Sequence, residues 1–313
     1  MIHRFAVFGD VHGRVALMLT LARRWQQEAR LPLDGILQVG DMGAFPDHDR
    51  LDRSTRRYAR HDPDELGFRD FLSPSPDAVS LLSPPDTPPI VFCRGNHEDF
   101  GYLSQHREPS PMDPWGKLWF VPDGQVLPWP IGAPELLRIG AFGAAAPLRP
   151  PAAERRGRSA RRSRRKADRA ELSLSMGPRF RLKDLQRVLS AELGPIDVLL
   201  THAGPLHPAW RGGSPHLTRL AQALKPRVHL FGHHHQVVGP LSTPNGLLVG
   251  LEHLEFIEDN TLRPGAWGIL SLDGASARFE WVDRQTYPWV ARFTRFSWRS
   301  LAQEARSEQE RAP

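Results

Sequence analysis

The sequence predicts an α/β fold in which buried strands alternate with helices. Three observations support this: short runs that are largely apolar, a helical stripe after the first run, and glycine or polar side chains shortly after each run. Strands that are apolar on both faces are typical of a sheet covered on both sides. A chain of 313 residues with 40% hydrophobic residues can also bury a sizeable core.

The predicted elements follow one another in a regular order. The first strand is expected over 4–8, and a helix over 14–30, where apolar residues lie three and four positions apart. Further buried strands are predicted at 36–39, 90–92, 196–200 and 228–231. Four later apolar segments, at 237–241, 247–251, 267–272 and 277–282, are predicted to form a second sheet layer.

We expect a single domain over residues 1–285, followed by a C-terminal helix or tail over 286–313. Two stretches look like insertions: a proline-rich one at 45–89 and an arginine-rich one at 147–180. No apolar run approaches the ~18 residues that a membrane helix needs, and Asp10 interrupts any signal-like segment. We therefore expect a cytoplasmic protein without membrane contact. The single cysteine, Cys93, excludes a disulfide framework within the chain.

The formal net charge of +6 is concentrated in residues 155–169. This segment holds nine basic residues and one acid, a charge of +8, which leaves −2 for the rest of the chain. A block of like charge is expected to be solvated. One interpretation is an exposed loop without a partner. The other is a contact with the phosphates of a nucleic acid or with an acidic partner, whose binding would weaken with salt.

Five motifs at the predicted strand ends carry side chains of one chemical kind. They contain Asp10 and His12, Asp41, Asn96 and His97, His202, and His233 and His235. The carboxyl ends of neighbouring parallel strands line the ligand crevice of an open α/β sheet, so these side chains are expected to converge. Carboxylate, amide and imidazole donors without a thiolate suit Mn, Fe, Zn or Co. Seven of these eight side chains as ligands fit two cations that share a carboxylate, an arrangement that clamps both oxygens of a phosphoryl displacement.

In order and residue type, these motifs resemble those of the calcineurin-like metallophosphoesterases over residues 4–282. The resemblance implies a two-layer β-sandwich flanked by helices and two divalent cations, with Mn²⁺ expected and Fe or Zn as alternatives. It implies the following ligands: Asp10, His12 and His235 for the first cation, Asn96, His202 and His233 for the second, and Asp41 as the bridge. It also implies that a bridging hydroxide attacks phosphorus while His97 protonates the leaving oxygen. A histidine suits that role because its ordinary pKa lies near neutrality.

The second motif departs from that of the serine/threonine protein phosphatases of this superfamily. Their GDxVDRG-like motif supplies an aspartate that pairs with the catalytic histidine, whereas residues 40–45 contain neither this aspartate nor the arginine. The sequence therefore does not identify the partner of His97, and a phosphoprotein substrate loses support. Residues 94–98 and 201–205 are loosely similar to RNA lariat debranching enzymes. Among phosphoesters, a phosphodiester is favoured.

Three hypotheses follow for the function. The first is a metal-dependent phosphoesterase of unknown substrate, the second a nucleic-acid phosphodiesterase that uses 155–169, and the third a non-catalytic binding or scaffold protein stabilised by metal. Candidate substrate contacts are Arg14, Arg94 and His207, each with the alternative of an ordinary surface residue. His97 has the alternative of supporting the ligands only, and His234 is expected to point away from the cations. The oligomeric state is left open.

Overall fold

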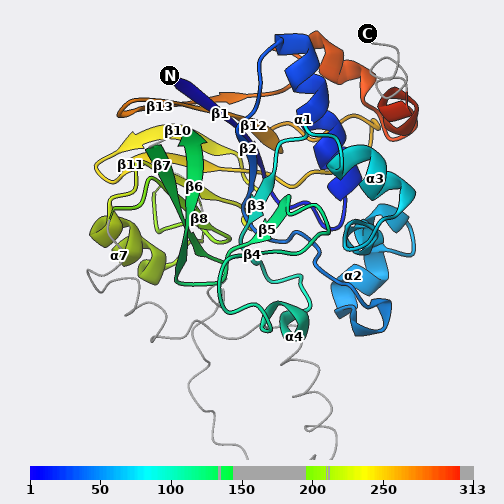
Figure 1. Cartoon of the computed structure of the whole chain (residues 1–313). Coiled ribbons are helices and arrows are strands. Elements are labelled where there is room, and N and C mark those ends of the chain that lie inside the picture. Colours follow the sequence, from blue (N-terminus) through cyan, green and yellow to red (C-terminus); the bar gives the residue numbers. More distant parts are fainter. Residues whose placement is uncertain (133–134, 144–194, 209, 211, 304–313) are drawn as a thin grey trace, which may run out of the picture.

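The structure is a computed structural model that describes residues 1–132, 135–143, 195–208, 210 and 212–303. Two sheets pack face to face between helices (Figure 1), which confirms the predicted α/β fold. The first sheet has the strand order β13-β12-β1-β2-β3-β5-β4, and the second has the order β10-β11-β9-β8-β7-β6.

The strand bounds agree closely with the predicted runs where a run was predicted. The first sheet contains β1 (Ile2–Phe8), β2 (Gly35–Gln38), β3 (Ile90–Phe92), β4 (Ser110–Pro111), β5 (Leu118–Phe120), β12 (Trp267–Asp273) and β13 (Ser276–Trp281). The second contains β6 (Gln125–Gly132), β7 (Glu135–Phe142), β8 (Val198–Thr201), β9 (Val228–Phe231), β10 (Val238–Thr243) and β11 (Gly246–Gly250). Strands β1, β2, β3 and β5 run parallel, as do β7, β8, β9 and β11.

The prediction that the four late strands belong to a second sheet layer is correct for two of them and wrong for the other two. Strands β10 and β11 lie in the second sheet, but β12 pairs with β1 and β13 pairs with β12, so both belong to the first. Strands β8 and β9 lie in the second sheet and not beside β1–β3. An apolar run predicts that a strand is buried, whereas its neighbours depend on long-range pairing that the run itself does not encode.

Alternation along β1 explains the layering. Phe5 and Val7 contribute to the core between the sheets, whereas Ala6 and Phe8 contribute to the core under the helices. Successive side chains of a strand point to opposite faces, so a strand buried on both sides is largely apolar. The same reasoning explains why the predicted runs show no polar alternation.

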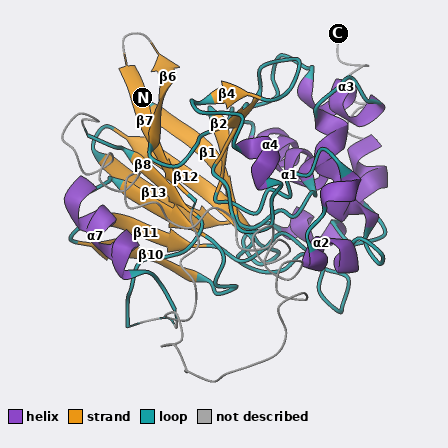
Figure 2. Cartoon of the chain, turned by 90° about the horizontal axis from the view of Figure 1, so that it is seen from below, coloured by secondary structure: helices purple, strands orange, loops and turns teal. Residues whose placement is uncertain are grey.

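Helices cover the outer faces of both sheets (Figure 2). Over the first sheet lie α1 (Val15–Ala29), α2 (Arg53–Tyr58), η2 (Pro63–Phe71), α3 (Pro76–Leu82) and α4 (Phe100–Leu103). Helix α7 (Pro215–Leu224) covers the second sheet, and its Leu217 and Leu220 pack against that sheet. Two short 3₁₀ turns, η1 (His48–Arg50) and η4 (Pro288–Arg292), complete the named elements.

Residues 45–89 are an integral part of this helical layer. Pro63 and Pro76 occupy the first turns of η2 and α3, where the missing N–H of proline costs no hydrogen bond. Phe68 and Phe71 from η2 are buried in the core beneath the helices. This packing places α2 beside the ends of the parallel strands.

The arginine-rich insertion predicted at 147–180, with its basic block at 155–169, lies outside the described residues. Residues 298–303 are helical, with Trp298 and Ala302 buried, and 304–313 lie outside the described part. In the described part of the chain, no helix combines the length and apolar character that crossing a bilayer requires.

Candidate metal centre and active site

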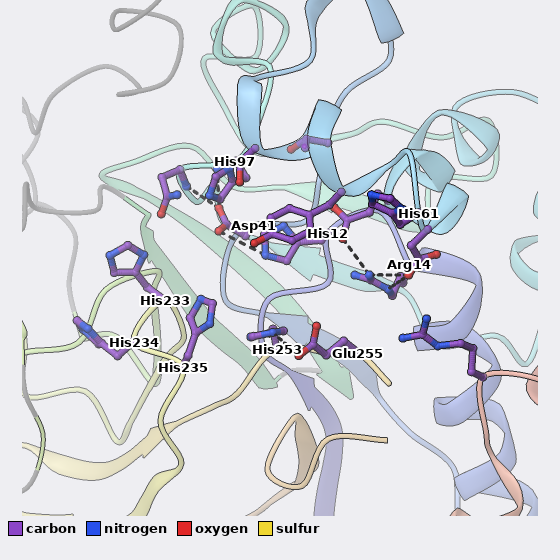
Figure 3. A pocket seen from close by; sticks show the side chains of 17 residues that line it. His12, Arg14, Asp41, His61, His97, His233, His234, His235, His253 and Glu255 are labelled. Carbon is purple, nitrogen blue, oxygen red and sulfur yellow. Dashed lines mark hydrogen bonds and ion pairs between the residues drawn. The ribbon is translucent and has the colours of Figure 1, made fainter. Parts of the chain in front are cut away.

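The five motifs meet at the carboxyl ends of the parallel strands, on both sides of the sandwich. The motifs at 10–12, 41 and 96–97 follow β1, β2 and β3 of the first sheet, and those at 202 and 233–235 follow β8 and β9 of the second. A cavity of about 740 Å³ opens here, lined by residues from four of the motifs and from α2 (Figure 3).

A buried cluster of Asp10, Asp41 and His202 joins the two sheets. One donor atom of each residue lies within 4.8 Å of the other two. His202 Nε2 lies 3.3 Å from Asp41 Oδ2, and His202 Nδ1 lies 3.8 Å from Asp10 Oδ1. Asp10 Oδ2 is buried without a hydrogen-bond partner. A buried carboxylate oxygen is costly when it has no partner, so this arrangement suits a bound cation.

The other four predicted ligands surround this cluster. Asn96 Oδ1 lies 2.9 Å from His202 Nε2, and the rings of His202 and His233 have centroids 4.8 Å apart. His12 Nε2 is 3.9 Å from Asp41 Oδ2, and His235 Nε2 is 3.9 Å from Asp10 Oδ2. All seven predicted ligands are therefore neighbours in space.

The backbone at these ligands is strained in a consistent way. His12, Asp41, His233 and His235 all have positive φ, between 45° and 67°. For a non-glycine residue, this left-handed region costs on the order of 1–2 kcal/mol, and such strain is concentrated at functional sites. At Gly232, a Cβ atom would collide with the carboxylate of Asp10, so the loop after β9 requires a glycine for this close approach.

His97 has a carboxylate partner that the sequence did not reveal, Asp52. His97 Nδ1 lies 2.8 Å from Asp52 Oδ2, and the backbone N–H of His97 donates to Asp41 Oδ1 at 2.7 Å. Asp52 is also the N-cap of α2, where it accepts a hydrogen bond from the Thr55 N–H at 2.8 Å. The one available signal was an aspartate directly before a helical segment, which indicates an N-cap and not a catalytic partner.

The electrostatics of His97 and Asp41 are coupled. Burial opposes a charge on His97, but Asp41 and Asp52 outweigh it and raise its pKa to about 9. Burial likewise opposes ionisation of Asp41, yet His202, His97 and His12 hold its pKa well below the ordinary value. Asp41 is thus the anionic centre of the site, and His97 carries a proton at neutral pH.

Burial sets the protonation of the remaining cluster residues. It raises the pKa of Asp10 to about 6, with His202 opposing the rise and Asp41 adding to it. It lowers the pKa of both His12 and His233 to about 3, which leaves neutral imidazoles whose lone pairs are available to a metal. Burial also opposes a proton on His202, but Asp41 and Asp10 raise its pKa to about 9. Metal binding would displace that proton.

Of the three predicted substrate contacts, only Arg14 lines the cavity. Its Nη2 donates to Asp62 Oδ2 at 2.8 Å and to Glu65 Oε1 at 2.9 Å, so its charge is balanced. Arg94 donates through Nε to an aspartate, Asp123, at 2.9 Å, and His207 stacks on Trp210 with centroids 4.5 Å apart. Neither is among the described residues that line the cavity.

His234 lies between two predicted ligands in the sequence, but its side chain forms a hydrogen bond to a different loop. Its Nε2 accepts a hydrogen bond from the Gly204 N–H at 2.9 Å, and it belongs to neither of the metal-capable clusters among the described residues. Figure 3 shows it farther from Asp41 than His233 is.

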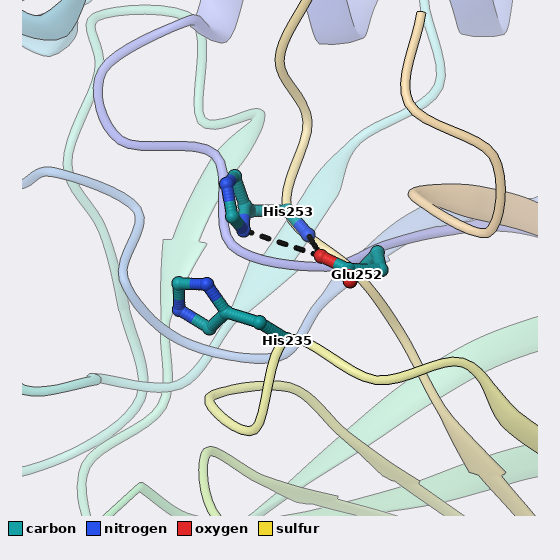
Figure 4. A group of neighbouring side chains, drawn as sticks. All are labelled: His235, Glu252 and His253. Atoms are coloured by element: carbon teal, nitrogen blue, oxygen red, sulfur yellow. Dashed lines mark hydrogen bonds and ion pairs between the residues drawn. The ribbon is translucent and has the colours of Figure 1, made fainter. Parts of the chain in front are cut away.

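A second metal-capable cluster includes two residues outside the five motifs, which the sequence analysis did not predict. His235, Glu252 and His253 each place one donor atom within 4.8 Å of the other two (Figure 4). Glu252 and His253 follow β11, at the same edge of the second sheet as the motifs. The signal was present, because a polar Glu-His pair directly follows the apolar run at 247–251.

Comparisons with known proteins identify a family for this chain. A family model described as calcineurin-like phosphoesterase matches residues 3–237. A search of curated proteins finds no match. A solved phosphatase from Mycoplasma pneumoniae is similar at 11% identity and a TM-score of 0.47, over 90% of this chain and 93% of that one. A 5'-nucleotidase from Candida albicans is similar at 13% identity and a TM-score of 0.42, over 97% of this chain and 57% of that one.

The family model spans most of the chain and includes all five motifs. The chain therefore belongs to the calcineurin-like phosphoesterase family.

Proposed function

We propose that this chain hydrolyses phosphoesters, with phosphodiesters as the favoured substrates, and that His97 is the acid that protonates the leaving oxygen. The observation that carries the proposal is the His97–Asp52 pair: its two side chains are 2.8 Å apart, the His97 N–H donates to Asp41 of the buried cluster, and His97 and Asp41 both line the cavity. An acid next to a cation site is the combination that phosphoester hydrolysis requires.

The donor set fits two divalent cations. We assign Asp10, His12 and His235 to the first, Asn96, His202 and His233 to the second, and Asp41 to both. The buried, unpartnered Asp10 Oδ2 supports a cation at this position. When bound, two such cations supply an activated water and neutralise charge on the phosphate. Among cations we propose Mn²⁺, with Fe or Zn as alternatives, because oxygen and imidazole donors accept all three.

The chain's own residues prepare His97 for proton donation. Asp52 engages Nδ1, so Nε2 is the nitrogen left to donate to the leaving oxygen. Asp41 and Asp52 keep the imidazole protonated by raising its pKa. The cavity of about 740 Å³ is far larger than one phosphate group and leaves room for an organic group on either side of it, which supports a diester.

The test compares two phosphodiesters whose leaving groups differ in basicity. His97→Asn should slow hydrolysis of an alkyl diester by about 10²–10⁴-fold, because an alkoxide must be protonated as it leaves. The same change should slow a p-nitrophenyl diester much less, because nitrophenolate leaves without a proton. His61→Asn, which alters another histidine of the same cavity, is the matched control. Equal losses on both substrates would show that His97 is not the acid.

A second candidate, hydrolysis of nucleic-acid phosphodiesters, is favoured by the nine basic residues in 155–169. Deleting this segment should weaken binding of a single-stranded oligonucleotide and flatten its salt dependence by about 0.7 in log–log slope for each phosphate that the segment neutralises. Unchanged binding after the deletion would remove this candidate.

A panel with mononucleotides, cyclic nucleotides and branched RNA would also separate a phosphoesterase from a metal-stabilised scaffold protein, which would turn over none of them.

A further inference from the structure

The loop after β11 brings a histidine and a glutamate against one of the proposed metal ligands. The rings of His235 and His253 have centroids 4.2 Å apart, and Glu252 completes a group whose donor atoms lie within 4.8 Å of one another (Figure 4). His235 Nε2 is also 3.9 Å from Asp10 Oδ2, the buried oxygen without a hydrogen-bond partner. Donors from β1, β9 and β11 therefore adjoin one another.

The partners of His253 fix which of its nitrogens can bind a metal. Its Nε2 lies 2.7 Å from Glu255 Oε1, and Glu255 Oε1 also accepts from Arg263 Nε at 2.8 Å. An ionised carboxylate only accepts hydrogen bonds, so Nε2 carries a hydrogen and Nδ1 is the nitrogen that can face a metal. Burial opposes a charge on His253, but Glu252 and Glu255 raise its pKa to about 9, so a metal would bind Nδ1 by displacing the proton there. Metal-binding histidines commonly donate their second nitrogen to a carboxylate in this way.

The free nitrogen of His253 faces another acceptor. Its Nδ1 is buried without a hydrogen-bond partner and lies 3.3 Å from Glu252 Oε2. Two buried acceptors at this distance repel each other unless a proton or a cation lies between them. With the cations of the neighbouring centre close by, a cation is the better occupant, because it satisfies Glu252, His253 and the neighbouring His235 together.

We propose that Glu252 and His253 are ligands of the cation held by Asp10 and His235, in addition to the residues of the five motifs. This inference rests on the proposed two-cation function. The cation held by Asp10 and His235 would then have more protein ligands than the cation held by Asn96 and His233. Glu255 and Arg263 act as positioning residues, because they orient His253 without reaching the cation themselves.

The test measures metal binding directly and not turnover. Metal-free protein is titrated with Mn²⁺, and free and bound ion are separated by equilibrium dialysis. The wild-type chain should bind two cations. His253→Gln and Glu252→Gln should each weaken one of them by about 10–100-fold and change the other less than twofold. Cobalt-loaded protein should show an altered visible spectrum in the same two variants, which reports on ligands without any catalytic step.

Controls separate this inference from the function on which it rests. His61→Gln lies in the same cavity outside both clusters and should leave both affinities unchanged. Thermal unfolding in chelator identifies a variant that fails to fold, in which case the other variant decides. If the wild type, His253→Gln and Glu252→Gln all bound two cations with the same affinities, this inference would be overturned and the two-cation function would stand. The inference would also be overturned by three cations in the wild type and two in the variants with unchanged affinities, because Glu252 and His253 would then form a separate site. Fewer than two cations in the wild type would instead overturn the two-cation function.

Discussion

At the scale of single residues, a motif predicts which side chains are functional but not which partners hold them. His97 was predicted from its motif, yet Asp52 comes from a different segment, on α2. His253 has a similar partner in Glu255, and the two histidine rings lie on either side of His12, with centroids 5.4 Å and 6.3 Å from it. Such partners depend on how separate segments pack, which residue spacing cannot reveal.

Asp52→Asn should reduce turnover of an alkyl phosphodiester by about 10–100-fold, because a neutral amide does not stabilise the protonated ring as the carboxylate does and can also present its NH₂ to Nδ1. KM should change little, since Asp52 holds His97 and not the substrate. Steady-state kinetics across pH should also show the limb that reports loss of the His97 proton moving to lower pH. Asp47 is an exposed aspartate that caps the neighbouring η1, so Asp47→Asn is the control and should change neither turnover nor the pH profile. An unshifted pH profile in Asp52→Asn would contradict a role in positioning His97.

At the scale of elements, the sequence identified strands that are buried on both faces and missed elements marked by proline. Strand β6 contains Pro128 and Pro130 and was not predicted, but it is the edge of its sheet, where a missing N–H is tolerated. Pro63 and Pro76 similarly concealed η2 and α3, although proline at a first turn is compatible with a helix. Edge position and helix register depend on tertiary packing, which composition does not encode.

Glu98 connects the loops after β2 and β3 and should matter for stability. Its carboxylate accepts backbone N–H groups from Met42 at 2.9 Å, Ala44 at 2.5 Å and Gly95 at 3.2 Å. Burial and Asp41 raise the pKa of Glu98 to about 8, so the comparison belongs at about pH 9, where the carboxylate is ionised. There Glu98→Gln turns one acceptor oxygen into a donor that faces an N–H group, and the free energy of unfolding should fall by about 1–3 kcal/mol. Urea denaturation against the exposed Glu108→Gln control checks this. Equal stability of the two variants would show that the three hydrogen bonds contribute little.

His229 on β9 should make the metal-free protein sensitive to acid. Its Nε2 lies 2.8 Å from Thr201 Oγ1 inside the second sheet, and burial lowers its pKa from 6.5 to about 3. The unfolded chain therefore binds this proton from pH 6.5 downward while the folded chain resists it. For each unit by which the pH falls in that window, the free energy of unfolding decreases by up to about 1.4 kcal/mol. In chelator, His229→Gln should lose less stability than wild type between about pH 7.5 and about pH 5. Parallel losses would contradict the assignment.

At the scale of the whole molecule, the site exists only where two sheets meet. Asp10, Asp41 and Asn96 follow strands of the first sheet, whereas His202, His233 and His235 follow strands of the second. No continuous segment therefore contains all of the proposed ligands. The order of the motifs was enough to predict that they converge, because strand ends of α/β proteins share an edge. The assignment of strands to two sheets could not be predicted, because it depends on pairing between distant segments.

The central claim is that side chains from both sheets hold two cations jointly through Asp41. The most direct measurement is the metal content of protein reconstituted with Mn²⁺ and freed of excess ion by gel filtration, for wild type and Asp41→Asn. We predict two ions per wild-type chain, and in the variant a loss of both with phosphodiester turnover reduced by at least about 10³-fold. A wild-type chain that never retains more than one divalent ion, or an Asp41→Asn variant with undiminished turnover, would contradict the claim.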